Sequence, residues 1–343
     1  MTPSNSIHAT APGGAVEYPT DAIIAVTYRC DARCEMCNIW QLKPQEFLSA
    51  EHYAQMPSSL RDINISGGEA FMRSDIIDIV RVIHQKCPEA RIVISTNGFR
   101  TAAILKAMDS LRTEIPGIGI GVSLDGIGEV HDRIRGIPNA FEKAMNTLRG
   151  LREREYTNVR IGFTAMTDNV GEMRKVYDLS RELGVEFTTA VAQNSEIYFS
   201  TRVNQSVEQG GLYDSLGYVM RRELMSYHPK RWLRAYFENG TLMFNRDGRR
   251  MLKCRAAHEF FYLAPEGVVY PCLTVPSPMG NLRETSFDAL WESQTAEAVR
   301  RDIDGCEKCW MICTARSGLK KSLPRAFGWI AREKLRAHMN RNT

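Results

Sequence analysis

The chain has 343 residues, a length that indicates more than one structural unit. Of these residues 43% are hydrophobic and 24% are charged, which is the composition of an ordinary globular protein and excludes intrinsic disorder. Its net charge of +4 is uneven, because residues 314–343 carry +7 and leave −3 for the rest. A nearly neutral body excludes an enzyme whose active face is a basic nucleic-acid groove, and no stretch approaches the ~20 consecutive apolar residues of a membrane-spanning helix.

Residues 1–19 are rich in small and turn-forming residues, and they lack the basic start and apolar run of a signal peptide. We therefore predict a flexible tail and a cytoplasmic protein. The nine cysteines then indicate metal binding, because a reducing cytosol disfavours disulfides. One group of cysteines lies near residue 34 and another after residue 250, with Cys87 alone between them. Two groups predict two metal sites.

Six short apolar runs alternate with helical patterns in the first part of the chain. They lie at 22–28, 62–66, 90–95, 117–124, 159–165 and 186–191. Strands separated by helices indicate βαβ units and a parallel sheet. The sequence therefore predicts an α/β fold with a partial (β/α)6 TIM-like barrel over residues 20–200. In such barrels the carboxyl ends of the strands carry the functional residues.

Three cysteines follow the first predicted strand, with the spacing C-x3-C-x2-C. Cys30, Cys34 and Cys37 can hold three irons of a 4Fe–4S cube and leave the fourth iron open to an outside molecule. An open iron is a site for chemistry as well as for electron storage. The alternative, a zinc site or inert thiols, lacks a fourth nitrogen or sulfur ligand close by in the sequence.

Glycines and small polar residues follow the next three strands. Gly67-Gly68-Glu69 lets the backbone approach a ligand closely and offers a carboxylate to an ammonium group. Asn97 and Ser123 follow the third and fourth strands, where small polar groups can hydrogen-bond a ribose or a carboxylate. Taken singly, each motif is also compatible with a simple turn.

Further polar residues follow the fourth and sixth strands. Arg135 ends a short run that also contains His131 and Asp132 and is followed by Gly136. For His131 and Asp132, just before it, we favour a role in capping a helix start. Gln193 and Asn194 follow the sixth strand and are candidates to bind a polar substrate, although loop polarity explains them equally well.

The last third of the chain carries five cysteines: Cys254, Cys272, Cys306, Cys309 and Cys313. A Pro-Glu-Gly turn ending at Gly267 lies between two apolar runs and predicts a β-hairpin beside the first two of these cysteines. The C-x2-C pair that follows a helical stretch is typical of a metal knuckle. Four thiolates hold zinc or an iron-sulfur cluster equally well. We predict a small β-hairpin-plus-helix domain over 251–317.

Two further segments read as helical. Residues 201–250 have helical periodicity and form a predicted connector. Residues 318–343 form a predicted basic amphipathic helix with one apolar face, made of Phe327, Ile330, Ala331, Leu335 and Met339. We expect this face to dock on the barrel. Contact with an anionic membrane surface or with an acidic group of the substrate is the alternative.

The cysteine loop, followed one βα unit later by Gly67-Gly68-Glu69, resembles the signature of the radical S-adenosylmethionine (SAM) superfamily. The later pattern C-x12-G-x4-C followed by C-x2-C resembles the SPASM/twitch extension of the same superfamily. The resemblance covers about residues 20 to 315. It departs from the family at Ala70, where Pro is usual, and at Met36, where an aromatic residue usually lies beside the adenine.

The resemblance implies two kinds of cofactor. SAM would chelate the open iron of a 4Fe–4S cluster on the first three cysteines, and one electron would cleave it to a 5′-deoxyadenosyl radical. The residues implied to bind SAM are Met36, Gly67, Gly68, Glu69, Asn97, Ser123 and Arg135. A full SPASM unit needs more thiols than are present, so we expect one auxiliary 4Fe–4S cluster on Cys254, Cys272, Cys306 and Cys309. Cys313 is left over; it either replaces one of these four or ligates a second, incomplete site.

A fully ligated auxiliary cluster has no place for SAM and can serve as an electron path. We therefore expect dehydrogenation of a small polar substrate, such as a sugar, a cyclitol or a lipid-linked version of one, with a flavodoxin- or ferredoxin-type reductant. The alternatives are radical epimerisation or coupling, maturation of a ribosomally made peptide, and a non-enzymatic electron-transfer or zinc scaffold. The sequence names no catalytic base and indicates no nucleic-acid partner.

Overall fold

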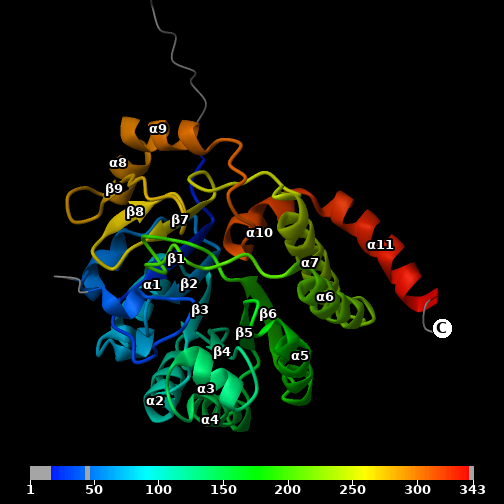
Figure 1. Cartoon of the computed structure of the whole chain (residues 1–343). Helices are drawn as coiled ribbons and strands as arrows, with labels where there is room; N and C mark the ends of the chain where they lie inside the picture. Colours follow the sequence, from blue (N-terminus) through cyan, green and yellow to red (C-terminus); the bar gives the residue numbers. More distant parts are fainter. Residues whose placement is uncertain (1–16, 43–46, 340–343) are drawn as a thin grey trace, which may run out of the picture.

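The computed structural model describes residues 17–42 and 47–339. Its first part is a set of six parallel strands in which neighbours in the chain are also neighbours in the sheet (Figure 1). The strands are β1 (Asp21–Ala25), β2 (Asp62–Ser66), β3 (Arg91–Thr96), β4 (Gly119–Ser123), β5 (Val159–Ala165) and β6 (Glu186–Val191). The predicted α/β fold with a six-stranded partial barrel is confirmed. The predicted flexible tail, residues 1–19, lies almost wholly outside the described residues.

Helices connect these strands and cover one face of the sheet. They are α1 (Ile76–Lys86), α2 (Thr101–Arg112), α3 (Glu129–Arg135), α4 (Ala140–Glu153) and α5 (Met173–Glu182). Shorter 3-10 helices are η1 (Ile39–Gln41), η2 (Ala50–Gln55), η3 (Ala70–Met72) and η4 (Val170–Glu172). In α1 the spacing of Ile76, Ile79, Val80 and Ile83 places all four on one buried face, which is how an amphipathic helix packs on a sheet.

The C-terminal part continues the same sheet instead of standing apart from it. The predicted hairpin forms between β7 (Phe260–Leu263) and β8 (Val268–Tyr270), which are antiparallel, and β9 (Gly280–Asn281) pairs with β8. However, β7 also pairs with β1, in parallel, so that one nine-stranded sheet runs from β6 to β9. Two helices follow, α8 (Phe287–Trp291) and α9 (Gln294–Ile303). The barrel and the C-terminal domain therefore share a single backbone framework.

The helical connector consists of α6 (Gln209–Leu224) and α7 (Pro229–Asp247), and the chain ends in α10 (Ile312–Lys321) and α11 (Leu323–Met339). In Figure 1, α10 lies between the sheet and α7, while α11 extends away from the barrel beside α6 and α7. The boundaries proposed between the domains stay predictions. No helix within the described ranges is long and apolar enough to cross a membrane.

The predicted docking of the terminal helix is wrong in its surface and in part of its face. α11 packs on α6 and α7 and not on the barrel, and it buries Ala326 and Ile330. Of the predicted apolar face, Ile330 is buried as expected, whereas Phe327, Leu335 and Met339 are exposed. Lys334, one turn after Ile330, also contacts α7, because its ammonium lies 4.0 Å from the Trp232 ring centroid. Membrane contact through α11 stays a prediction.

The connector is joined to the C-terminal domain by a close approach at Gly240, in the middle of α7. A Cβ atom at this position would lie 2.2 Å from the Trp310 ring. Trp310 in turn stacks on Phe237 at 5.6 Å between ring centroids and donates its indole N–H to the Phe237 carbonyl at 3.0 Å. The missing side chain of Gly240 is therefore what lets the indole lie flat against the helix.

We predict opposite effects for two glycine-to-alanine changes in these helices. Gly240→Ala should reduce the free energy of unfolding by about 1–3 kcal/mol, because the added methyl overpacks the Trp310 contact. Gly217→Ala, at an exposed position of α6 where the methyl meets no atom within 4 Å, should stabilise the protein by up to about 1 kcal/mol through helix propensity. Thermal and urea unfolding of both variants, followed by circular dichroism, measures this; equal effects would contradict the packing role of Gly240.

Candidate active site

A cavity of about 320 Å³ opens at the carboxyl ends of the barrel strands. We call it the large cavity, to distinguish it from the small pocket of the C-terminal thiols. Its lining contains every residue predicted to bind the first cluster or SAM except Glu69: Cys30, Cys34, Cys37, Met36, Gly67, Gly68, Asn97, Ser123 and Arg135. The rest of its wall is largely apolar. It includes Ile39, Trp40, Tyr198 and Phe199 and, from the C-terminal segments, Leu273, Met311, Ile312 and Cys313. The structure therefore brings together motifs that are spread over more than 100 residues of sequence.

The three thiols of the first group are half-buried on the wall of this cavity. Burial raises the pKa of Cys30 to about 12 and that of Cys37 to about 11, so without a metal both stay protonated at neutral pH. Two donors are aimed at their sulfurs: Arg135 Nη1 lies 3.5 Å from Cys34 Sγ, and the Ala32 amide lies 3.4 Å from Cys30 Sγ. Such donors stabilise metal-bound thiolates, so the donor set fits an iron-sulfur cluster.

The zinc alternative finds no support in the geometry. Among the described residues, no three His, Cys, Asp or Glu side chains converge closely enough to hold a single metal ion. The thiolates of a 4Fe–4S cube bind different irons and so stand farther apart than the ligands of one ion.

Backbone hydrogen bonds fix the cysteine loop onto α3. The amides of Arg33 and Glu35 donate to the carbonyls of Arg135 at 2.8 Å and Ile134 at 2.9 Å. On its other side, Asp31 accepts hydrogen bonds from Asn97 Nδ2 at 2.7 Å and from an arginine that follows β3 at 2.8 Å. The loop is thus held by two separate βα units, which defines where its thiols point.

The two glycines after β2 are needed for a close approach to the chain that leaves β1. Gly67 has φ +135°, and a Cβ atom there would lie 2.3 Å from the Thr27 carbonyl oxygen. A Cβ atom on Gly68 would lie equally close to the Arg29 carbonyl. The Gly68 amide donates to Thr27 at 2.7 Å, so the glycine loop and the approach to Cys30 form one tightly packed unit.

Glu69 is the one predicted SAM-binding residue outside the cavity lining, and its contact with an ammonium group stays a prediction. Its side chain is fully buried and does not line the cavity. Its carboxyl accepts hydrogen bonds from Thr96 Oγ1 at 2.8 Å and from the amides of Asn97 at 2.7 Å and Phe71 at 3.2 Å. Burial raises its pKa to about 7, and these hydrogen bonds oppose the rise. In the structure, Glu69 joins the ends of β2 and β3.

Arg135 is held by a carboxylate that the sequence analysis did not single out. Its Nη2 lies 2.6 Å from Asp125 Oδ2, and Asp125 is completely buried at the end of β4. The other Asp125 oxygen accepts from the Thr164 amide at 2.8 Å. The sequence does contain a signal for this pair. Residues 123–126 are Ser-Leu-Asp-Gly, so a carboxylate lies two residues after Ser123 at a strand end. Asp125 positions Arg135 over the thiols and balances its charge.

The helix-capping interpretation is supported for Asp132 but not for His131. Asp132 accepts hydrogen bonds from the amides of Asn139 at 2.9 Å and Phe141 at 2.7 Å, at the start of α4. His131 Nδ1 accepts from the Asp125 amide at 3.0 Å, and burial lowers the pKa of His131 to about 2. A neutral, buried imidazole in this arrangement stabilises the loop and is not exposed to a substrate.

Four of the five C-terminal thiols meet at a second place in the structure. Cys254, Cys272, Cys306 and Cys309 line one small pocket together with Arg250, Thr274 and Thr314. Hydroxyls of the two threonines lie 3.4 Å from Cys272 Sγ and 4.0 Å from Cys309 Sγ. Burial raises the pKa of Cys309 to about 12. Four thiols in a pocket whose described lining has hydrogen-bond donors and no carboxylate fit an iron-sulfur cluster.

Cys313 lies near Cys272 and Cys309 but faces a different cavity from these four thiols. It is buried on the wall of the large cavity, and it does not line the small pocket. Burial raises the pKa of its thiol. Gln193 lines both the large cavity and a second cavity of about 340 Å³ beside it, and Asn194 lines the second one. Thr274 lines this second cavity as well as the pocket of the four thiols.

The structure combines a parallel partial barrel, which has three clustered thiols at its open end, with a domain that has four more. This combination is typical of iron-sulfur enzymes, and comparison with known proteins identifies the family. Residues 24–180 match the family model described as the radical SAM superfamily, and residues 254–310 match one described as an iron-sulfur cluster-binding domain, SPASM. The chain belongs to the radical SAM superfamily and carries a SPASM domain. Its cofactors are accordingly SAM, a 4Fe–4S cluster and auxiliary iron-sulfur clusters.

The related proteins differ in what they act on. The chain is 27% identical over 286 residues to an AdoMet-dependent heme synthase of Methanosarcina barkeri, covering 77% of this chain and 78% of that one. It is 23% identical to the subtilosin biosynthesis protein AlbA of Bacillus subtilis, of which it spans 63%. The solved structure of anSMEcpe with bound AdoMet has a TM-score of 0.63 at 15% identity, covering 92% of this chain and all of that one, which shows the same fold.

We predict that the buried pair beside the thiols is far more sensitive than an exposed one. Asp125→Asn should reduce the free energy of unfolding by about 3–5 kcal/mol, because it leaves the Arg135 charge buried without its partner. Asp109→Asn, which alters an exposed pair with Arg154 at 3.1 Å, should cost less than about 1 kcal/mol. Urea unfolding of both variants measures the difference, and a small effect of Asp125→Asn would contradict the positioning role of the pair.

Proposed function

We propose that this chain is a radical SAM enzyme that removes a hydrogen atom from a substrate bound in the large cavity. The substrate radical would then lose a proton and pass one electron to the C-terminal cluster, which completes a two-electron oxidation. The observation that carries the proposal is the composition of that cavity wall. The three thiols and the strand-end residues lie on it, and so do Leu273 and Met311, which are one and two residues from Cys272 and Cys309. A substrate in this cavity would lie beside both cluster sites.

Each group of residues has a proposed role. Cys30, Cys34 and Cys37 would hold the cluster that, when bound, supplies the electron for cleaving SAM and so forms the radical that abstracts hydrogen. The backbone of Gly67 and Gly68 would meet the amino end of SAM. Glu69 would position this loop from behind, because its carboxyl is already hydrogen-bonded to the β3 end.

The remaining SAM contacts are proposed on the same wall. Arg135 would bind the carboxylate of SAM while Asp125 holds it in place. Asn97 and Ser123 would hydrogen-bond the polar parts of SAM, and Met36 would pack beside the adenine. A flavodoxin- or ferredoxin-type protein is the proposed electron donor.

We propose one auxiliary cluster, on Cys254, Cys272, Cys306 and Cys309, because these four thiols share one pocket. When bound, it would supply a place for the second electron of the oxidation. Arg250, which donates hydrogen bonds to the Cys309 carbonyl and to Thr314 at 3.2 Å, would hold the knuckle in shape.

For the substrate, the cavity favours a molecule with an apolar body and polar groups at its edge. Trp40, Phe199, Leu273 and Met311 present apolar surface, whereas Gln193 and the neighbouring cavity present amides and Lys308. A lipid-linked sugar or cyclitol fits this description better than a free one. The heme synthases among the relatives add tetrapyrroles to the candidate substrates, and the relative AlbA adds peptides.

Epimerisation is a second candidate, favoured by Cys313. The described lining of the cavity contains no Asp, Glu or His side chain that could serve as a base. It does contain the Cys313 thiol, which burial keeps protonated. A neutral thiol can return a hydrogen atom to a substrate radical, which would invert a carbon centre without net oxidation of the substrate. The thiyl radical left on Cys313 would then take up one electron, supplied by the proposed flavodoxin- or ferredoxin-type reductant, and a proton from solvent.

We predict that loss of one thiol of the first group abolishes SAM cleavage. With dithionite and SAM, the reconstituted wild-type protein should form 5′-deoxyadenosine, and Cys34→Ser should not, because the cluster loses an iron ligand. Cys87→Ser is the matched control, since Cys87 is buried in the core, does not line the cavity, and donates a hydrogen bond to the Pro57 carbonyl at 3.3 Å that a serine hydroxyl can replace. Chromatography of the nucleoside product measures this. Equal product from wild type and Cys34→Ser would contradict the proposal.

We predict that two cysteines only 41 residues apart behave differently. Cys272→Ser should lose about half of the bound iron, the share of one of two clusters, and still form 5′-deoxyadenosine. Cys313→Ser should keep all of its iron, because Cys313 lies outside the pocket of the four thiols. Iron analysis and electron paramagnetic resonance of the two variants measure this. Iron loss in Cys313→Ser would show that it is a ligand.

The Cys313→Ser variant also separates the two candidate reactions. If the enzyme epimerises its substrate, wild-type product formed in heavy water should carry deuterium delivered by the exchanged thiol, and the variant should lose it. If the enzyme dehydrogenates its substrate, the variant should retain turnover.

A further inference from the structure

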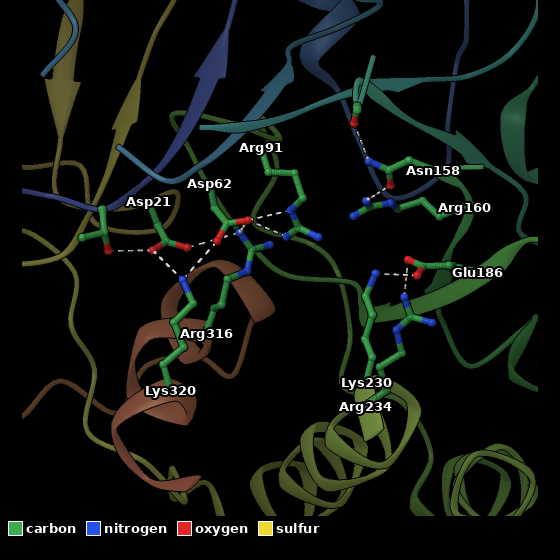
Figure 2. A network of polar contacts seen from close by, with 12 residues as sticks. Asp21, Asp62, Arg91, Asn158, Arg160, Glu186, Lys230, Arg234, Arg316 and Lys320 are labelled. Carbon is green, nitrogen blue, oxygen red and sulfur yellow. Dashed lines mark hydrogen bonds and ion pairs between the residues drawn. The ribbon is translucent and has the colours of Figure 1, made fainter. Parts of the chain in front are cut away.

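The opposite end of the barrel, where the strands begin, contains a separate cavity of about 160 Å³ that none of the roles above uses. Its walls come from the first residues of β3, β5 and β6 and from α7 and α10. Five basic side chains line it: Arg91, Arg160, Lys230, Arg234 and Arg316. Figure 2 shows these side chains converging from the sheet, from α7 and from α10. A cluster of like charges at the closed end of a barrel calls for a physical explanation.

On one side of the cavity, two carboxylates share three cations. Asp62 lies 2.5 Å from Arg91, 3.3 Å from Arg316 and 3.1 Å from Lys320 (Figure 2). Asp21, on the neighbouring strand, lies 3.2 Å from Arg316 and 3.9 Å from Lys320. This side therefore has one more cation than carboxylates.

On the other side, Glu186 at the start of β6 is the partner of two cations from α7. It pairs with Lys230 at 2.5 Å and also with Arg234. Glu238 lines the cavity too, but burial raises the pKa of its carboxyl to about 8, which leaves it largely uncharged at neutral pH. This side also has one more cation than carboxylates.

Arg160 lies between the two sides and has no carboxylate partner among the described residues. Its Nη2 donates to the Asn158 side chain at 3.0 Å, and its buried Nε has no hydrogen-bond partner. Burial lowers the pKa of Arg160 to about 10; the charge of Glu186 opposes this shift, and the charges of Arg91, Arg234 and Arg316 contribute to it. An unpaired buried guanidinium is costly unless another anion balances it.

Six cations thus face three carboxylates around this cavity, and even if Glu238 is counted as ionised, two positive charges remain in excess. We propose that the cavity at the amino ends of the barrel strands binds a phosphate group, free or as a phosphate monoester, against Arg160. Guanidinium groups recognise phosphate oxygens through paired N–H donors, and a divalent anion matches the excess charge. The cavity is also of a size for one such group and some water, and is half as large as the candidate active site.

The site is linked to the candidate active site through α10. Ile312, the first residue of α10, lines both cavities, and Arg316 one turn later contacts the carboxylates of β1 and β2. Cys313 lies between these two residues. A phosphate group bound to Arg160 and Arg316 would therefore hold in place the helix that carries the Cys313 thiol. The proposal concerns the charge balance of this cavity and stands independently of the proposed reaction.

Calorimetric titration of the full-length, cluster-reconstituted protein with sodium phosphate, at constant ionic strength in chloride buffer, tests the site. The wild type should bind phosphate saturably at one site. Arg160→Met, which keeps the side-chain length and removes the charge, should bind roughly tenfold or more weakly, the effect of losing one charge-assisted contact. Arg149→Met is the matched control, because Arg149 lies on the exposed face of α4 and pairs only loosely with Glu142, at 3.6 Å. It should bind as the wild type does.

Thermal unfolding provides a second readout. Phosphate should raise the Tm of the wild type to a plateau, and Arg160→Met without phosphate should be no less stable than the wild type, because the repulsion is relieved. If Arg160→Met does not fold, Lys230→Gln, at a half-exposed position of the same cavity, should weaken phosphate binding. Equal phosphate affinity in wild type and Arg160→Met, or no saturable binding by the wild type, would overturn the proposal.

Titration with three anions distinguishes a phosphate monoester from free phosphate and from a carboxylate as the bound group. Tighter binding of glycerol 3-phosphate than of orthophosphate would assign the site to a phosphate monoester, and the reverse order would assign it to the free ion; either supports the proposal. Saturable binding of malonate without any binding of the two phosphates would show a carboxylate site and overturn it.

Discussion

The parallel pairing of β7 with β1 is the constraint on which the rest of the structure depends. Ile24 of β1 lies opposite Leu263 of β7, and the chain that leaves β1 leads within a few residues to Cys30. The chain that leaves β7 forms the hairpin that ends at Cys272. Because backbone hydrogen bonds of one sheet hold both segments, the two groups of thiols are fixed relative to each other without a flexible joint between the domains. Leu273 can then reach the wall of the large cavity.

The same framework explains why the cysteine loop needs few contacts of its own. Its backbone is hydrogen-bonded to the end of α3, its Asp31 to the segment after β3, and its approach is packed against the glycines after β2. Three consecutive βα units therefore each contribute one element to the same place, as the parallel arrangement requires of strand ends. Asp125 and Glu69 also hold these loops in place, because their buried carboxyls accept hydrogen bonds from several neighbouring segments.

Much of this could be predicted from the sequence, because the evidence was local. The six strands are short apolar runs between helices, and each candidate ligand follows its own strand. The pairing of β7 with β1 could not, since those segments are more than 200 residues apart and nothing in either states its partner. The buried face of α11 was mispredicted in part because apolar periodicity favoured Leu335 and Met339, whereas the helix packs through Ala326, Ile330 and the Lys334 contact with Trp232. The place of Cys313 likewise depended on where α10 begins.

The basic C-terminal segment shows how a charge count changes meaning once the chain is folded. Taken as a sequence, its cations form a tail suited to an anionic surface. In the structure, Arg316 and Lys320 turn inward to Asp21 and Asp62, and Lys321 pairs with Glu259. The positive charge is therefore concentrated at the amino ends of the barrel strands, opposite the thiols. Since Coulomb interactions strengthen where water is excluded, this excess acts on Arg160 more strongly than the same charges would on an exposed helix, and a bound anion is the simplest way to balance it.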